Sequence, residues 1–152
     1  MKFDFTTEFD RRGMDALAVD GLGLIDATTS SLGKRTIGEV ASTPLIDGLT
    51  APLTGFENHM GATILGSDAS PLGRLTRGVG NCDAHGSRSP EDVGVEGAVQ
   101  GSIIATYMHG PALARNPELA DLLLARAMGV AVDELAPLGI DCVDQLRKER
   151  LR

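Results

Sequence analysis

The sequence is poor in aromatic residues and in cysteine. It has no tryptophan, one tyrosine, four phenylalanines and two cysteines among 152 residues. A core without tryptophan has to be built from aliphatic and small side chains, and a hydrophobic content of 42% suffices for this in one domain. Neither Cys82 nor Cys142 belongs to a C-x-x-C motif, which argues against a structural zinc site. Two isolated cysteines are typical of a reduced, cytoplasmic protein.

Long apolar runs and basic faces are also missing. No apolar run approaches the roughly 20 residues of a membrane-spanning helix, and the N-terminus lacks the apolar region of a secretory signal, so we expect no membrane insertion. Acidic residues outnumber basic ones by 21 to 14, which argues against a nucleic-acid partner. We interpret the terminal basic cluster as a helix end whose cations face the helix dipole; it consists of Arg147, Lys148, Arg150 and Arg152.

Glycine, in contrast, is abundant, with 19 residues, many of them where turns belong. Apolar and β-branched segments predict strands at residues 21–29, 36–42, 53–61, 62–65, 75–81 and 95–108, of which the last is the longest. Residues 30–33 (SSLG) are expected to form a turn, and residues 82–94 an exposed loop. Residues 2–19 are interpreted as irregular or hairpin-like.

Helix signals are confined to the end of the chain. Asn116, Pro117 and Glu118 predict a helix start, with a capping amide, a proline at the first position and an acid in the first turn. Gly129 predicts its end. A last helix is expected from about residue 140, with Cys142 in the core and with the inward-facing side chains Ile140, Val143 and Leu146.

These elements predict a single α/β domain that is rich in strands and has its helices at the C-terminus. An α/β sheet normally alternates strands with crossover helices, yet the first ~110 residues hold almost no helix signal. The chain is therefore either an α+β domain or the second half of an α/β domain whose βαβ units lie upstream.

His109 is the first candidate for chemistry. It closes the longest predicted strand, and the carboxyl end of a strand is where α/β proteins place functional side chains. Gly110 allows close approach of the backbone, and Pro111 fixes the exit of the chain. The alternative is a histidine that only satisfies local hydrogen bonds at a turn.

The second candidate group is an acid, an amide and an imidazole at consecutive positions, Glu57, Asn58 and His59. In an extended segment Glu57 and His59 share one face and Asn58 points to the other. Such residues can also merely satisfy loop backbone. No spacing supports a metal site made from Glu57, His59 and His109, so we expect neither a metal nor a cofactor.

Two further candidates are weaker on local grounds. The guanidinium of Arg35 can hold a carboxylate through two parallel hydrogen bonds, although a solvated Lys34-Arg35 pair is the simpler interpretation. Cys82 is a nucleophile by residue type only, with His85 near it in sequence. The neighbouring Asp83 works against a reactive thiolate, because a nearby negative charge raises the pKa of a thiol.

Three segments in fixed order carry a resemblance: GLGLIDATTS, TGFENHMGATILG and GSIIATYMHGPALARNPELADLLL. Together they resemble the class I glutamine amidotransferases of the cobyric acid synthase (CobB/CobQ-like) type, over about residues 20–128. Within this family the FENH motif (56–59), the YMHGP run (107–111) and the NPELA run (116–120) are most similar to the glutaminase subunits of lipid II isoglutaminyl synthases. The implied fold is flavodoxin-like.

The resemblance implies an activity. A cysteine thiolate attacks the side-chain amide carbon of glutamine, ammonia leaves, and water hydrolyses the thioester to glutamate. His109 matches the catalytic histidine of the family, and Arg35 matches an arginine that would clamp the α-carboxylate of glutamine. Glu57, Asn58 and His59 would line the site. The ammonia would serve a Mur-ligase-like synthetase subunit that amidates lipid II, a peptidoglycan precursor.

The sequence departs from the family at two points. In related amidotransferases a glutamate two residues after the histidine orients the ring, and Pro111 stands there instead. The nucleophile of the family lies in a glycine-rich elbow before the segment that begins at Gly21, and residues 1–20 contain no cysteine. Residues 1–152 are therefore expected to be one partial domain that is inactive alone. A glutaminase part of a cobyric or cobyrinic acid synthase and a non-catalytic remnant or scaffold are the alternatives.

Overall fold

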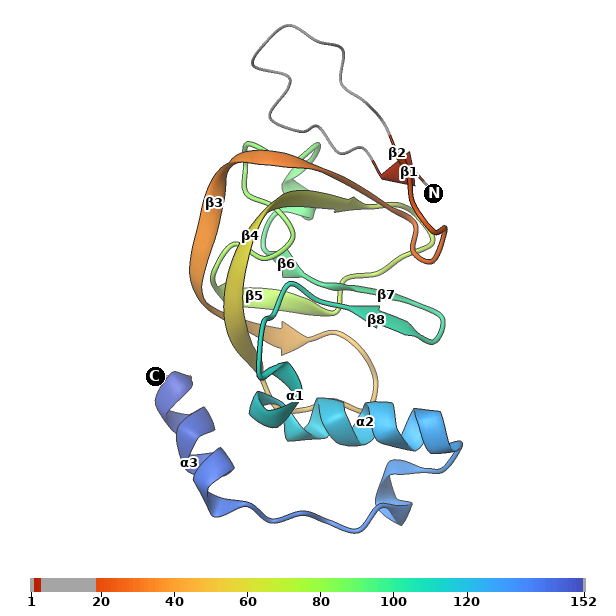
Figure 1. Cartoon of the computed structure of the whole chain (residues 1–152), viewed down its shortest axis with the longest axis vertical. Helices are drawn as coiled ribbons and strands as arrows, with labels where there is room; N and C mark the ends of the chain where they lie inside the picture. The colour runs from red at the N-terminus through yellow and green to blue at the C-terminus, as the bar shows by residue number, and fades with distance from the viewer. Residues whose placement is uncertain (1, 4–18, 152) are drawn as a thin grey trace, which may run out of the picture.

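The computed structural model of the chain describes residues 2–3 and 19–151 (Figure 1). Its centre is a long antiparallel hairpin made by β3 (Ala27–Pro44) and β4 (Leu53–Leu65). β5 (Gly73–Arg77) pairs with the other edge of β3, and β6 (Val95–Glu96) pairs with β5. The four-stranded sheet therefore has the order β4-β3-β5-β6, with antiparallel pairs throughout.

The turn predicted at residues 30–33 is wrong. These residues lie inside β3, where the register against β4 shifts between Ser31 and Thr36. Leu32 is buried with Ala62 of β4, and Gly33 takes the left-handed conformation with φ of 71°. A bulge accommodates such an irregularity without reversing the chain, so the predicted strands 21–29 and 36–42 merge into one. The predictions at 53–61 and 62–65 likewise merge into β4.

The long strand predicted at residues 95–108 is also wrong. The segment forms β6 and then a separate hairpin of β7 (Ala98–Gln100) and β8 (Ile103–Ala105). Gly97 and Gly101 separate these pieces, with φ of 70° and 59°. Glycine reaches this left-handed region at no steric cost, and there it ends the strand despite the apolar neighbours.

Two further segments, residues 2–19 and 82–94, are predicted to be irregular or loop-like. β1 (Lys2–Phe3) pairs antiparallel with β2 (Val19–Asp20), and the rest of the segment predicted as irregular or hairpin-like, residues 4–18, lies outside the described residues. Residues 82–94 form a loop that contains the short 3-10 helix η2 (Pro90–Asp92).

The expected fold class, α/β with helices near the C-terminus, is confirmed. α1 (Ala112–Arg115) and α2 (Pro117–Met128) lie beneath the end of the sheet at which β3 stops (Figure 1). α2 begins at Pro117 and ends at the left-handed Gly129, as predicted. The capping role of Asn116 is wrong, because its buried amide binds the backbone N–H and C=O of Thr54 at 2.8 and 2.9 Å. Asn116 thus ties the start of α2 to β4.

The last helix, α3 (Asp141–Arg150), follows the 3-10 helix η3 (Val132–Glu134) and does not pack as predicted. It buries no side chain, and Cys142 is exposed rather than in the core. The predicted inward apolar stripe is wrong too, since Ile140 and Leu146 are 48% and 41% exposed. Arg147 holds the helix instead, through the carbonyl oxygens of Arg115 and, at 3.0 Å, Pro52. The surface that α3 meets offers these oxygen atoms, which an apolar stripe cannot bind.

The core is aliphatic, as the composition requires. Its main cluster joins the sheet to α2 and consists of Val40, Leu49, Leu53, Leu72, Met108, Leu119 and Leu122. No helix among residues 2–3 and 19–151 combines the length and the apolar character needed to cross a membrane.

Candidate active site

His109 lies beside β4, four residues beyond the end of β8. Its backbone N–H donates to the carbonyl oxygen of Phe56 at 2.7 Å, which makes an isolated antiparallel bridge. Met108 is buried in the core, while His109 is exposed. Gly55 permits this close approach, because a Cβ atom there would lie 2.5 Å from the Cβ of Met108. The imidazole of His109 therefore extends into solvent from a backbone that is fixed by the bond to Phe56 and by the burial of Met108.

Arg35 and Asn58 share the face of β4 on which His109 lies. Side chains opposite one another in an antiparallel pair point to the same face, as do residues i and i+2 of a strand. Phe56 therefore places both His109 and Asn58 on one face, and Phe56 and Asn58 are separated by about 7 Å along the strand. Arg35 Nε donates to Asn58 Oδ1 at 2.7 Å. Within the described part of the chain, this bond leaves the Nη groups of the arginine for another ligand.

Glu57 and His59 lie on the opposite, buried face, as the alternation predicts. The carboxylate of Glu57 accepts the backbone N–H groups of Val79 and Gly80, both at 2.9 Å, and lies 3.8 Å from His59 Nε2. Burial by itself raises the pKa of Glu57, but His59 and the two N–H groups together lower it below the ordinary value. Of the three candidate lining residues, Asn58 alone therefore shares the face of His109.

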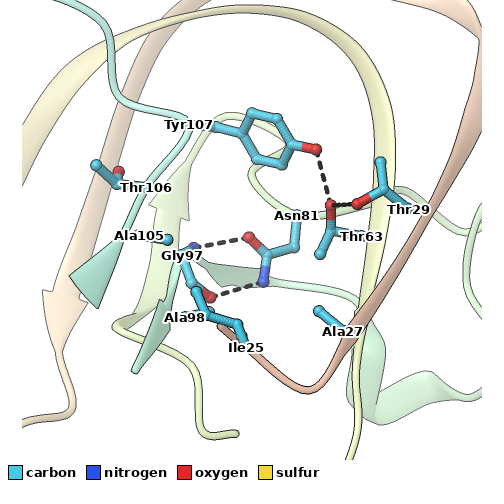
Figure 2. A pocket seen from close by; sticks show the side chains of 10 residues that line it. All are labelled: Ile25, Ala27, Thr29, Thr63, Asn81, Gly97, Ala98, Ala105, Thr106 and Tyr107. Atoms are coloured by element: carbon cyan, nitrogen blue, oxygen red, sulfur yellow. Dashed lines mark hydrogen bonds between the residues drawn. The ribbon is translucent and has the colours of Figure 1, made fainter. Parts of the chain in front are cut away.

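His59 and Tyr107 stack inside the molecule. Their ring centroids are 4.0 Å apart with an interplanar angle of 16°, and His59 Nδ1 lies 3.0 Å from the carbonyl oxygen of Gly61. The Tyr107 hydroxyl is hydrogen-bonded to Thr63 at 2.7 Å, and Thr63 to Thr29 at 2.9 Å (Figure 2). His59 Nε2 is buried without a hydrogen-bond partner among the described residues. His59 thus supports Tyr107, which precedes His109 by two residues.

A cavity of about 220 Å³ lies beside Tyr107, between the long hairpin and the β7–β8 hairpin. In its wall the side chain of Asn81 makes two hydrogen bonds with Gly97, at 2.7 and 2.8 Å (Figure 2). The hydroxyls of Thr29 and Thr63 are bonded to each other, Thr63 is also bonded to Tyr107, and the hydroxyl of Thr106 donates to Glu96. Because these polar groups already have partners, the cavity offers mainly apolar surface.

Glu96 is a further candidate site residue, which the sequence analysis did not single out. It is fully buried, and its Oε1 accepts the hydroxyl of Thr106 and the backbone N–H of Tyr107, the latter at 2.9 Å. Burial, with a smaller contribution from Glu57, raises the pKa of Glu96 against the lowering effect of these hydrogen bonds. The available signal was a single acid at the start of the apolar segment 95–108.

Cys82 is not an activated nucleophile in the described structure. The Cys82 thiol is buried and donates to the carbonyl oxygen of Asp92 at 3.2 Å. Burial, together with the charges of Asp92 and Asp83, raises the pKa of Cys82 to about 11. Lys34 pairs with Asp83 at 2.7 Å, so the Lys34-Arg35 pair is not merely solvated. Among the described residues no group of three or more His, Cys, Asp or Glu side chains could hold a metal ion.

Comparison with known proteins gives two kinds of relative. Residues 6–117 match the CobB/CobQ-like glutamine amidotransferase domain. The cobyric acid synthase of Sphingopyxis alaskensis is 36% identical over 126 residues, which cover 80% of this chain and 21% of that protein. The lipid II isoglutaminyl synthase (glutamine-hydrolyzing) subunit GatD of Staphylococcus aureus is 37% identical over 114 residues, covering 74% and 41%. The GatD subunit of Streptococcus pneumoniae is 34% identical over 111 residues, covering 72% and 39%.

The chain thus spans about a fifth to two fifths of the length of these relatives. Cobyric acid synthases and GatD subunits are similar to this chain to nearly the same degree, so the percentage of identical residues does not favour one kind of relative over the other.

Proposed function

The chain belongs to the CobB/CobQ-like glutamine amidotransferase family, and on this premise we propose that it supplies the acid–base and substrate-binding half of a site that releases ammonia from glutamine. One observation carries the proposal. The exposed His109 is anchored through Phe56 on the face of β4 where Asn58 holds Arg35. An imidazole and a guanidinium on one exposed face can address the two ends of a glutamine molecule.

His109 is the proton carrier in this proposal. The imidazole takes the proton of the attacking thiol, and the thiolate adds to the amide carbon of glutamine. The tetrahedral intermediate collapses, and the imidazolium gives its proton to the departing nitrogen, which leaves as ammonia. His109 then deprotonates a water molecule that attacks the thioester, and the thiol is regenerated together with glutamate.

Arg35 fixes the other end of the substrate. Its Nε is bonded to Asn58, which orients the guanidinium plane and leaves the Nη groups for the α-carboxylate of glutamine. The exposed position of Arg35 lets a free amino acid reach it. Asn58 is therefore a positioning residue for the clamp.

The nucleophile has to come from a polypeptide segment other than these 152 residues. With a pKa of about 11, Cys82 is a thiolate in about one molecule in 10⁴ at pH 7. Cys142 is exposed on α3, far along the chain from the candidate residues. In this proposal residues 1–152 are one partial domain that is inactive by itself.

The ammonia serves the amidation of a peptidoglycan precursor, lipid II, by a Mur-ligase-like synthetase subunit. The support is that the GatD relatives are glutamine-hydrolyzing subunits of lipid II isoglutaminyl synthase. A second candidate is the glutaminase part of a cobyric acid synthase, because such a protein matches 80% of the chain. A non-catalytic remnant is the third, since the Cys82 thiol is buried and its pKa is raised.

The test joins the chain to the part of the Staphylococcus aureus GatD subunit that the match leaves uncovered, which in this proposal bears the nucleophile, and measures glutamate release from glutamine. We expect turnover by the reconstituted protein and none by the chain alone. Turnover by the chain alone that Cys82→Ser abolishes would overturn the assignment of the nucleophile. Supplying either a Mur-ligase-like subunit with lipid II or a corrin substrate then separates the first two candidates by the product that becomes amidated.

A further inference from the structure

The segment that delivers His109, residues 106–108, has no strand partner in the described structure. β8 ends at Ala105, and the next bridge is the one between His109 and Phe56. The backbone N–H groups of such a segment need other acceptors. Tyr107 N–H donates to Glu96 Oε1 at 2.9 Å, and Met108 N–H donates to Thr106 Oγ1 at 2.9 Å. Side chains therefore replace the missing ladder.

Both of these bonds lead to a single carboxyl group. The hydroxyl of Thr106, which accepts Met108 N–H, itself donates to Glu96 Oε1. Glu96 belongs to β6, where it pairs with Gly73 of β5, so its own backbone is fixed by the sheet. The carboxyl group thus connects the sheet to two successive amides immediately before His109.

Burying the carboxyl group of Glu96 to make this connection costs folding free energy. Glu96 is fully buried, and its Oε2 has no hydrogen-bond partner among the described residues. Burying a carboxyl group with one oxygen unsatisfied destabilises a fold. A glutamate at this position is therefore better explained by a functional role than by a contribution to stability.

We infer that Glu96 is a positioning residue for His109, which it holds in place through Thr106 and the backbone of Tyr107. The ring of Tyr107 stacks on His59 and its hydroxyl is bonded to Thr63, the latter contact visible in Figure 2, so the same segment is also held through this side chain. The catalytic consequence of this inference rests on the proposed function, whereas the positioning itself does not.

Substitutions of Glu96 can show whether its hydrogen-bond acceptor or its negative charge is needed. Both donors to Oε1 are neutral groups, so the bonds persist whether the carboxyl is ionised or not. Glu96→Gln keeps an acceptor oxygen at the same distance, and Glu96→Leu removes it. Thr106→Ser and Thr106→Val make the same distinction for the hydroxyl at a position that is solvent-exposed and easier to replace.

Because the chain has few histidines and a single tyrosine, NMR and circular dichroism can observe His109 and Tyr107 individually in the 152-residue chain. It has three histidines, so ring ¹H–¹³C correlation spectra separate His109 from His59 and His85. Tyr107 is its one tyrosine and there is no tryptophan, so the tyrosine band of the near-ultraviolet circular dichroism spectrum reports Tyr107. The signals of α2 verify that each variant is folded.

We expect Glu96→Gln and Thr106→Ser to leave the His109 signals sharp. Glu96→Leu and Thr106→Val should broaden or split them and weaken the tyrosine band by about half, while His85 stays unchanged. Glu91→Leu, which changes an exposed acid, is the matched control for the loss of a glutamate. If Glu96→Leu fails to fold, the comparison of Thr106→Ser with Thr106→Val tests the inference. Sharp, unshifted His109 signals in Thr106→Val would overturn the inference.

A kinetic readout in the reconstituted protein distinguishes this inference from the proposed function. Thr106→Val should lower kcat about 10-fold or more with KM for glutamine nearly unchanged, and Thr106→Ser should restore it, because misplacing a catalytic group affects the chemical step. If His109→Ala is as active as the unmodified protein, the proposed function fails while the spectroscopic result on Glu96 stands. If kcat of Thr106→Val is unchanged although its His109 signals broaden, the catalytic consequence is refuted.

Discussion

Gly55→Ala should move His109 without touching it. A Cβ atom at residue 55 would lie 2.5 Å from Cβ, 2.7 Å from Cγ and 3.2 Å from Cα of Met108. Carbon atoms in contact are about 3.5–4.0 Å apart, so the Met108 backbone has to retreat by about 1 Å. Such a retreat lengthens the 2.7 Å bond between His109 N–H and Phe56 to about 3.7 Å, beyond the range of a hydrogen bond.

Two effects should follow. Overpacking of this kind lowers the free energy of unfolding by about 1–3 kcal/mol, which urea titration followed by circular dichroism will measure. A displacement of about 1 Å at a catalytic group can cost about 10²-fold in rate, so kcat of the reconstituted protein should fall by that order.

Gly38→Ala is the matched control. Gly38 lies in β3, has no positive φ and has nothing within 4 Å of an added Cβ atom. Alanine there should be neutral or stabilise by about 0.4–1 kcal/mol through the unfolded chain. If Gly55→Ala proves as stable and as active as Gly38→Ala, the packing of Met108 does not hold His109 and the reasoning is refuted.

Three other predictions test the remaining features. Arg35→Lys keeps the charge but loses the fork that binds a carboxylate with two bonds, so KM for glutamine should rise about 10-fold with kcat nearly kept; equal KM values would remove Arg35 from the site. Because the folded protein lowers the pKa of Glu57, its carboxylate stabilises the fold above the ordinary glutamate pKa of 4.5, and this stability is lost as the pH falls through the lower, folded-state pKa. Urea titrations should therefore show a gap between the unmodified protein and Glu57→Gln at pH 7 that closes in acid; a gap independent of pH would contradict this. Iodoacetamide at pH 7 should alkylate the exposed Cys142 and spare Cys82, whose pKa is about 11, and rapid labelling of Cys82, read by peptide mass, would show an activated thiol.

Local sequence rules predicted the parts of the fold that depend on neighbouring residues. The start of α2 at Pro117 and its end at Gly129 follow from backbone chemistry at those residues, and both predictions are confirmed. The role of Asn116 could not be predicted in this way, because its partner Thr54 lies 62 residues away in sequence. The same limit applies to α3, whose anchoring by Arg147 depends on carbonyl oxygens that only the folded chain brings together.

The candidate site shows the same division. Alternation along a strand predicted that Glu57 and His59 share one face and Asn58 the other, which the contacts of these residues confirm. The strand predicted to end on His109 is interrupted at Gly97 and Gly101. A run of apolar residues does not reveal at which glycine the backbone adopts the left-handed conformation. Glu96 escaped notice because its partners are supplied by the fold.

The central claim is that His109 carries the proton during hydrolysis of glutamine, and glutamate release by the reconstituted protein tests it most directly. His109→Ala should leave folding nearly intact, because the side chain is exposed, and should lower kcat by about 10²-fold or more. His59→Ala is the control at the other histidine of a motif, on the buried face. An active His109→Ala beside an inactive but folded His59→Ala would contradict the assignment, and a His109→Ala that does not fold would show that the residue is structural.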